Sequence, residues 1–104
     1  MTALVLVITE GSDAGRGFQV SGTLSIGRDA ATGIVIDDEE ASRRHAVVTR
    51  DGDGVIVRDL DSTNGTWVNE ERVASERRVR VGDRLRIGAT VLELRTGEVM
   101  TRRS

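Results

Sequence analysis

The chain has 104 residues and a mass of 11.3 kDa, which is enough for one domain with a single hydrophobic core. Its hydrophobic content of 38% and its 12 glycines are ordinary for a globular protein, so the composition excludes intrinsic disorder. It has no Cys, no Lys and a single His. These absences exclude disulfide frameworks, thiolate nucleophiles, zinc ribbons, Schiff-base lysines, P-loops and multi-histidine metal sites.

The charge balance and the hydropathy pattern narrow the class of protein further. A net charge of −2 and an isoelectric point near 5.4 argue against general nucleic-acid binding, which needs a basic surface. The N-terminal apolar run, residues 3–8, is far shorter than the ~20 residues of a membrane span and lacks the basic residues of a signal peptide. We therefore expect a cytoplasmic monomer that does not insert into membranes.

Short apolar or alternating runs, separated by glycines, favour an all-β fold. Val and Ile outnumber Leu, and β-branched side chains suit a pleated sheet better than a helix. About ten short strands at this spacing predict a sandwich or a barrel. The runs lie at residues 3–8, 17–20, 23–26, 34–36, 45–49, 54–58, 66–68, 79–81, 84–87 and 90–95.

Two charged stretches, residues 37–45 and 69–78, interrupt this strand pattern. Both contain helix-favouring residues, but neither has apolar residues at i, i+3, i+4 and i+7, so we expect loops with at most a turn of helix. The next segment, residues 78–87, alternates between apolar residues and arginine. The alternation predicts a hairpin with one core face and one solvated face that carries four guanidiniums. The apolar positions are Val79, Val81, Leu85 and Ile87, and the arginines are Arg78, Arg80, Arg84 and Arg86.

A polar turn at residues 59–66 is the strongest local motif. Its Asn64-Gly65 pair is typical of a tight turn with positive φ, and Ser62, Thr63 and Asn64 crowd hydroxyl and amide donors onto it. These donors could bind a ligand, or they could cap the turn's own backbone, as in Asx and ST turns. Taken alone, the motif favours the structural interpretation.

The acidic residues of this turn do not predict a metal site. Asp59, Asp61 and Thr63 have the spacing of an EF-hand loop, with Glu70 at its twelfth position. Asn64 occupies the place where that loop needs glycine, however, and no helices flank the segment. We expect neither a metal nor a cofactor.

An arginine lies just beyond the expected strand at residues 23–26. Gly27-Arg28 follows that run directly, and an arginine leaving a strand end can present its planar guanidinium to a phosphate or a carboxylate. One exposed arginine among 15 has no meaning by itself. The pair therefore counts only in combination with other motifs.

The segment Ser42-Arg43-Arg44-His45 leads into another expected strand. Ser42 and His45 could suggest a nucleophile and its base. A hydrolase also needs an orienting acid and an oxyanion hole, and the chain lacks a Gly-x-Ser-x-Gly elbow. We therefore predict no enzymatic activity and a structural, hydrogen-bonded His45.

The order of these motifs resembles the forkhead-associated (FHA) domain family. Gly27-Arg28 after a strand, Ser42-x-x-His45 further on, and Thr63-Asn64-Gly65 before another strand follow the family's arrangement, and the match runs from about Leu24 to Leu94. The resemblance implies an all-β sandwich of about eleven short strands in two sheets, with the binding loops at one end. We expect residues 1–96 to form the FHA-like domain and residues 97–104 a flexible C-terminal tail.

The resemblance also implies phosphothreonine-dependent binding of partner proteins in Ser/Thr-kinase signalling. Arg28 would grip the phosphate, and the hydroxyls of Ser42 and Thr63 would donate to it. Arg43 would add backbone contacts and could add side-chain contacts, and Asn64 would hold the main chain of the bound peptide. Three further positions of this sequence match structural positions of the family: Gly27, His45 and Gly65.

An alternative hypothesis has the same fold but no binding of phosphate. In it, the domain is a scaffold that binds an unphosphorylated partner or its own chain. Whether binding depends on phosphate separates the two. The use of Arg alone as the basic residue hints at a GC-rich bacterial genome, which would fit a bacterial kinase pathway.

Two features depart from the family's usual pattern. Many members have Asn-Gly after the aromatic-Val pair, whereas this chain has Asn69-Glu70, so the shape of that turn is open. The loop before Ser42 is strongly acidic over residues 37–40, and in the family this loop helps to select the residues that follow the phosphothreonine. We expect Glu40 or a neighbour to disfavour acidic side chains at those peptide positions.

Overall fold

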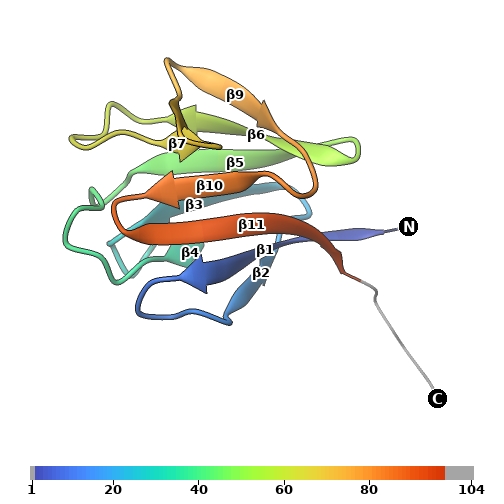
Figure 1. Cartoon of the computed structure of the whole chain (residues 1–104), viewed down its shortest axis with the longest axis horizontal. Coiled ribbons are helices and arrows are strands. Elements are labelled where there is room, and N and C mark those ends of the chain that lie inside the picture. The colour runs from blue at the N-terminus through green and yellow to red at the C-terminus, as the bar shows by residue number, and fades with distance from the viewer. Residues whose placement is uncertain (1, 98–104) are drawn as a thin grey trace.

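A computed structural model describes residues 2–97, which form eleven strands in two sheets (Figure 1). The six-stranded sheet has the order β2-β1-β11-β10-β7-β8, and the five-stranded sheet has the order β4-β3-β5-β6-β9. The described part contains no helix, so the expectation of an all-β sandwich is confirmed. The strands are β1 (Ala3–Glu10), β2 (Gly17–Gln19), β3 (Thr23–Gly27), β4 (Ile34–Val35), β5 (Ala46–Asp51), β6 (Gly54–Asp59), β7 (Trp67–Val68), β8 (Glu71–Arg72), β9 (Glu76–Val79), β10 (Arg84–Ile87) and β11 (Thr90–Gly97).

The core lies between the two sheets because alternate residues of each strand point inward. In β1, Leu4, Leu6 and Ile8 are at most 1% exposed, whereas Val5 and Val7 between them are half-buried on the outer face. The inward residues of β11 and β10 extend this layer from the same sheet, and those of β3, β5 and β6 face it from the other. This period of two is what places one face of each strand in the core.

The predicted hairpin over residues 78–87 is wrong. β9 ends at Val79 in the five-stranded sheet, where Val79 lies opposite Val55, while β10 belongs to the six-stranded sheet. The intervening turn carries the chain across the edge of the sandwich and leaves Val81 46% exposed. The four arginines therefore do not share one face. Alternation shows which side chains of a strand point the same way, but not which sheet the strand joins.

The stretch 69–78 is not simply the loop that was expected. It contains β8, a two-residue strand, and the start of β9, which runs from residue 76 to residue 79 and not from 79 to 81. These strands are short or rich in charged residues, so they lack the apolar alternation by which strands are recognised. The stretch 37–45 is a loop without a helix, as expected.

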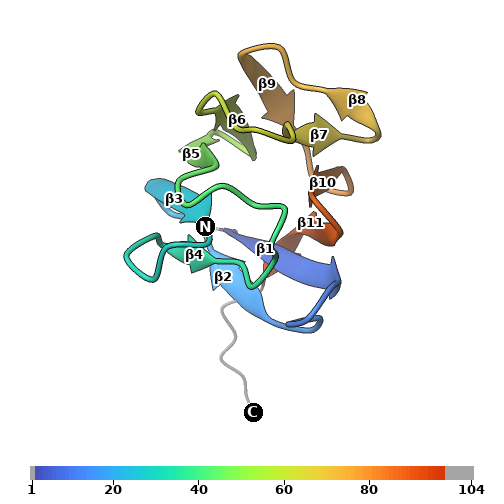
Figure 2. The same cartoon turned by 90° about the vertical axis from the view of Figure 1, so that its left-hand side faces the viewer.

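The two ends of the sandwich differ in what they carry. The loops that follow β3, β4 and β6 lie together at one end, which faces the viewer in Figure 2. Ala3 and Gly97 pair at the opposite end, so Gly97 closes β11 and does not begin the expected tail. The remainder of that predicted tail, residues 98–104, lies outside the described residues.

Candidate functional site

Gly27 brings the loop before β5 against the end of β3. A Cβ at Gly27 would coincide with the carbonyl group of Arg43, so only glycine allows this approach. The amide of Arg28 donates to the Ser42 carbonyl at 3.1 Å, and the amide of Asp29 donates to the Arg43 carbonyl at 3.1 Å. Arg28 and Ser42, fourteen positions apart in the sequence, are therefore held side by side.

The guanidinium of Arg28 is oriented by the backbone of the same loop. Its Nε donates to the Ala41 carbonyl at 2.8 Å, and the residue is exposed. Within residues 2–97, no hydrogen bond or ion pair occupies its two terminal nitrogens. The planar fork is thus fixed at one nitrogen and open at two, which suits an oxyanion ligand.

Ser42 and Thr63 meet where the two loops touch. The Thr63 amide donates to Ser42 Oγ at 3.3 Å, Ser42 is half-buried, and Thr63 is exposed. This bond uses a lone pair of the Ser42 oxygen and leaves its hydroxyl proton free for donation. Arg43 is exposed beside them.

His45 is fully buried and joins the two loops. Its Nδ1 accepts from the Ser42 amide at 3.0 Å, so the ring proton is on Nε2, which donates to the Gly65 carbonyl at 2.8 Å. Gly65 has φ of +89°, as the predicted tight turn requires. The histidine contacts the backbone of Ser42 and not its hydroxyl, in agreement with a structural role.

Asn64 connects the turn to the acidic loop. Its Nδ2 donates to the Glu40 carbonyl at 2.8 Å, and its own carbonyl accepts from Trp67 Nε1 at 3.3 Å. In the described part of the chain its Oδ1 takes part in no hydrogen bond. The expected contact of Asn64 with a bound peptide stays a prediction.

Asp59, at the end of β6, organises the turn and was not among the predicted site residues. Its carboxylate accepts from the Ser62 amide at 3.1 Å, from Ser62 Oγ at 2.5 Å and from Thr66 Oγ1 at 2.7 Å. Partial burial would raise the pKa of Asp59, but the hydroxyl and amide hydrogen bonds outweigh it and hold the pKa below its usual value. An Asp three residues before a Ser at a strand end is the signal that could have revealed this cap.

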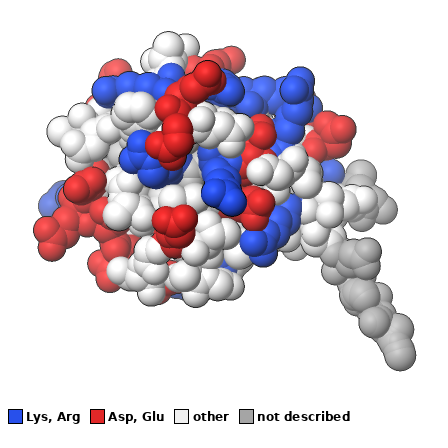
Figure 3. Space-filling view, in the orientation of Figure 1, with Lys and Arg blue, Asp and Glu red and all other residues white. Residues whose placement is uncertain are grey.

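The acidic loop has one structural carboxylate. Asp38 accepts from the Glu40 amide at 2.9 Å, from the Ala89 amide at 3.0 Å and from Thr90 Oγ1 at 2.9 Å. Burial alone would raise the pKa of Asp38, but these bonds lower it overall. The other acidic residues of the loop, Asp37, Glu39 and Glu40, are exposed, and acidic side chains gather at the loop end in Figure 3. Among residues 2–97, no group of His, Cys, Asp and Glu is arranged to hold a metal ion.

The arrangement of these loops can be compared with known proteins. A family model described as FHA domain matches residues 24–88. The chain belongs to the FHA domain family. It is 41% identical over 91 residues to the FHA domain-containing protein FhaB of Mycolicibacterium smegmatis, a match that covers 86% of this chain and 59% of FhaB. The chain thus spans about three fifths of the length of the curated relatives it matches first.

Solved FHA structures share the whole sandwich. One, from a study of phosphothreonine-dependent FHA domain interactions, superposes with a TM-score of 0.82 at 34% identity and covers 93% of this chain and 99% of its own. Mycobacterium tuberculosis EmbR, solved with a low-affinity phosphopeptide, superposes with a TM-score of 0.82 at 29% identity over 96% of this chain and 26% of EmbR. No helix in residues 2–97 is long and apolar enough to cross a membrane.

The turn in which this FHA domain departs from the family keeps the usual hairpin geometry. Asn69 and Glu70 have φ of 49° and 67°, and they join Val68 to its partner Glu71 as a two-residue loop. Positive φ at both positions is the geometry that Asn-Gly favours in such hairpins. Glu70 thus holds a left-handed conformation that costs a side-chain-bearing residue roughly 1–2 kcal/mol.

Proposed function

We propose that this FHA domain binds phosphothreonine in partner proteins of Ser/Thr-kinase signalling. The observation that supports the proposal is the convergence of three donors at one loop end: the open guanidinium of Arg28 and the hydroxyls of Ser42 and Thr63. A phosphothreonine has a charge of about −1.5 to −2 and three strong acceptor oxygens. One cation and two hydroxyls on loops that are tied to each other match those requirements.

The rigidity of the loops supports the same function. Recognition of a small anion depends on donors that are already in place, because ordering them on binding would cost affinity. The close approach at Gly27, the buried His45 and the capping carboxylate of Asp59 hold the three donors before any ligand arrives. In this proposal, the exposed side chain of Asn64 binds the main chain of the peptide.

A catalytic function has less support. The Nδ1 of His45 is occupied by the Ser42 amide, so the imidazole does not contact the Ser42 hydroxyl as a general base would. The proposal is therefore a non-enzymatic binding module that needs no cofactor. The monomeric state and the cytoplasmic location expected from the sequence stay predictions.

The acidic loop gives the site a further selectivity. Glu39 and Glu40 are exposed on the loop whose backbone, at the Glu40 carbonyl, accepts from the Asn64 side chain, and their charges would repel an acidic residue of the peptide. We expect few acidic residues at the peptide positions that this loop contacts. Strong acidic selection there, in a degenerate phosphothreonine library, would contradict this part of the proposal.

Binding of peptide libraries tests the function. Fluorescence anisotropy compares degenerate phosphothreonine, phosphoserine and unphosphorylated libraries on the wild type, Arg28→Ala and Arg58→Ala. The control, Arg58, is an exposed arginine on β6 that is not among the predicted binding residues. We expect wild type and Arg58→Ala to bind the phosphothreonine library, and Arg28→Ala to lose about 2–5 kcal/mol of binding free energy.

Two outcomes would contradict the proposal. A loss of less than threefold in a folded Arg28→Ala variant, checked by thermal unfolding, would exclude Arg28 as the phosphate ligand. Binding that is equal for phosphorylated and unphosphorylated libraries would favour the scaffold alternative.

A further inference from the structure

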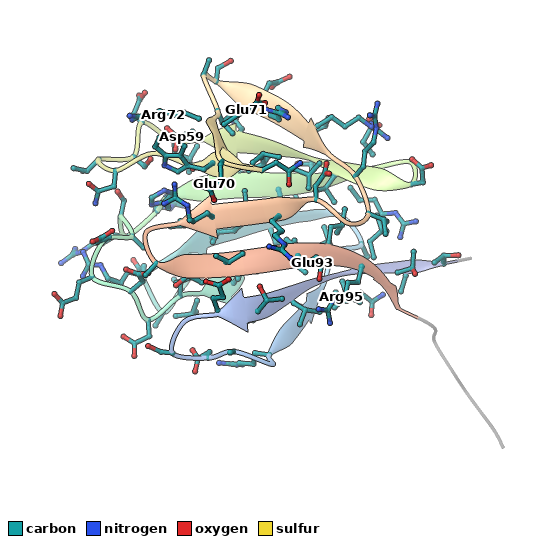
Figure 4. All side chains as sticks on the ribbon, viewed as in Figure 1. Asp59, Glu70, Glu71, Arg72, Glu93 and Arg95 are labelled. Carbon is teal, nitrogen blue, oxygen red and sulfur yellow. The ribbon has the colours of Figure 1, made fainter. Side chains whose placement is uncertain are left out.

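Arg72 lies directly beside the turn that carries Thr63 and Asn64. It is the last residue of β8, the edge strand of the six-stranded sheet, where it pairs with Trp67. Its guanidinium lies over the Trp67 ring at 5.9 Å from the centroid. A Cβ at Gly65 would lie 2.9 Å from Arg72 Nε, so the guanidinium packs against the residue that follows Asn64. In Figure 4, Arg72 is on the loop side of the sheet, away from Glu93 and Arg95.

The carboxylates nearest to Arg72 in sequence are used by other arginines. Glu71 pairs with Arg77 at 2.7 Å, and Glu70 pairs with Arg86 at 3.0 Å. Arg86 also stacks on Trp67, at 4.9 Å from the ring centroid, so the indole is flanked by two guanidiniums. Glu70 neutralises the guanidinium of Arg86 but not that of Arg72.

Arg72 itself has no ion pair within residues 2–97, and it is exposed. Stacking on the indole limits the rotamers of the long side chain while it leaves the edge of the guanidinium open to solvent. An arginine held in this way loses less conformational entropy on binding than a free one. It is therefore a ready cation for an anionic ligand at the rim of the loop end.

We propose that Arg72 is a specificity-determining residue that binds a second anionic side chain, a carboxylate or a second phosphate, in the same peptide that carries the phosphothreonine. The inference rests on the proposed function. Asn64 links the acidic loop to Arg72, since its side chain donates to the Glu40 carbonyl and its neighbour Gly65 contacts Arg72. Asn64 thus lies between a loop with exposed carboxylates and an arginine that has no ion pair among the described residues. This polarity selects where in the peptide an acidic residue is accepted.

Position-scanning peptides test the role of Arg72. Each peptide has one phosphothreonine in a neutral alanine background, with a single Glu, phosphoserine or Lys moved through the flanking positions. Affinities are measured by anisotropy for the wild type, Arg72→Gln and the matched control Arg58→Gln, which removes the same charge from the other sheet. Thermal unfolding checks that each variant is folded.

The expected result is a gain that depends on position and on Arg72. Glu at one position tightens binding to the wild type and to Arg58→Gln by roughly two- to fivefold, as for an exposed ion pair, and phosphoserine there tightens it further. Arg72→Gln loses this gain and binds the alanine-background peptide as the wild type does. The gain shrinks as salt is raised from 50 to 500 mM, because screening weakens an exposed pair. Arg72→Glu reverses the preference, so that Lys becomes the favoured residue at the same position.

The outcomes distinguish a failure of the role of Arg72 from a failure of phosphothreonine binding. If the wild type binds the alanine-background phosphothreonine peptide but no position shows a gain, or if Arg72→Gln keeps the gain, the role of Arg72 is overturned and the phosphothreonine function stands. If no phosphothreonine peptide binds at all, both are overturned.

Discussion

Several arginines on the sheet faces are neutralised by carboxylates, whereas among the described residues those at the loop end are not. Each of four guanidiniums on the sheets has a carboxylate partner: Arg77 with Glu71, Arg78 with Asp51, Arg86 with Glu70 and Arg95 with Glu93. At the loop end, Arg28, Arg43 and Arg44 have no ion pair in the part of the chain that the structure describes. Exposed ion pairs add little stability, but they leave no net charge behind. The loop end therefore keeps three guanidiniums that no ion pair of the described residues neutralises and that an anionic ligand can use.

The two regions also differ in how their polar groups are fixed. The ion pairs of the sheets join side chains that keep a quarter or more of their surface exposed, whereas His45, Ser62 and Thr66 are buried and bonded to backbone or to Asp59. A buried polar group left without its partner costs about 1–3 kcal/mol, against at most about 1 kcal/mol for an exposed pair. Substitutions that disturb the loop end should therefore change stability and binding together, and substitutions on the sheet faces should change neither by much.

The largest effect is expected for Gly27→Ala. The new methyl group would collide with the Arg43 carbonyl and push the loop of Ser42 away from β3, at a cost of about 3 kcal/mol in unfolding free energy. Phosphothreonine binding should fall as well, because Arg28 and Ser42 separate. Chemical denaturation and peptide anisotropy measure the two effects. The control is Gly22→Ala, since a Cβ at Gly22 has no atom within 4 Å. Equal stability of the two variants would show that the loop of Ser42 moves away from β3 at little cost in free energy. The loop end would then be no more sensitive to substitution than the sheet faces.

A smaller effect, which depends on pH, is expected for Asp59→Asn. The variant should lose about 1–3 kcal/mol of unfolding free energy at pH 7, because the Ser62 and Thr66 hydroxyls lose a charged acceptor. The folded pKa of Asp59 lies below its usual value of 3.8, so this stabilisation is complete above about pH 4 and is lost as the pH falls through the folded pKa.

Denaturation at several pH values checks the prediction for Asp59. The difference between wild type and Asp59→Asn should be constant from pH 7 to pH 5 and should shrink in more acidic solution. A difference that stays the same down to pH 2 would mean that the charge of Asp59 does not stabilise the turn.

The smallest effect is expected on the sheet side, at Glu70→Gly. Glycine relieves the left-handed strain of Glu70 but removes the ion pair with Arg86, so we expect a net gain of about 0.5–1 kcal/mol in unfolding free energy. Glu70→Gln keeps the strain and removes only the charge, and it should be neutral or slightly destabilising. Thermal unfolding of the two variants separates the effect of the backbone strain from the effect of the ion pair. A loss of stability in Glu70→Gly would show that the ion pair between Glu70 and Arg86, which lies over the Trp67 ring, is stronger than an ordinary surface pair.

The sequence predicted the parts of the fold in which local pattern and tertiary position agree. Strands such as β1 are recognisable as short runs of apolar, largely β-branched residues, of which Leu4, Leu6 and Ile8 are buried. The motif residues Arg28, Ser42, Thr63 and Asn64 were found through their order along the chain, and the structure brings them to one end of the sandwich (Figure 2).

The parts that were missed depend on contacts between distant segments. The segment around Val79 and Leu85 reads as one hairpin, because alternation contains no information about which strand lies next to which. β8 has only two residues, both exposed, and its place is decided by pairing with Trp67. Likewise, nothing local distinguishes Arg72 from the other arginines, because its position beside Gly65 exists only after that pairing has formed.

The pairing of Ala3 with Gly97 has a mechanical consequence. β1 begins where β11 ends, so a force that pulls these two residues apart acts on the last rung of an antiparallel ladder. We expect the two strands to unzip one hydrogen bond at a time, at low force, and not to shear along their whole length. The separation of β1 from β11 would start at the end farthest from the loops and would reach the loops around Arg28 last (Figure 1).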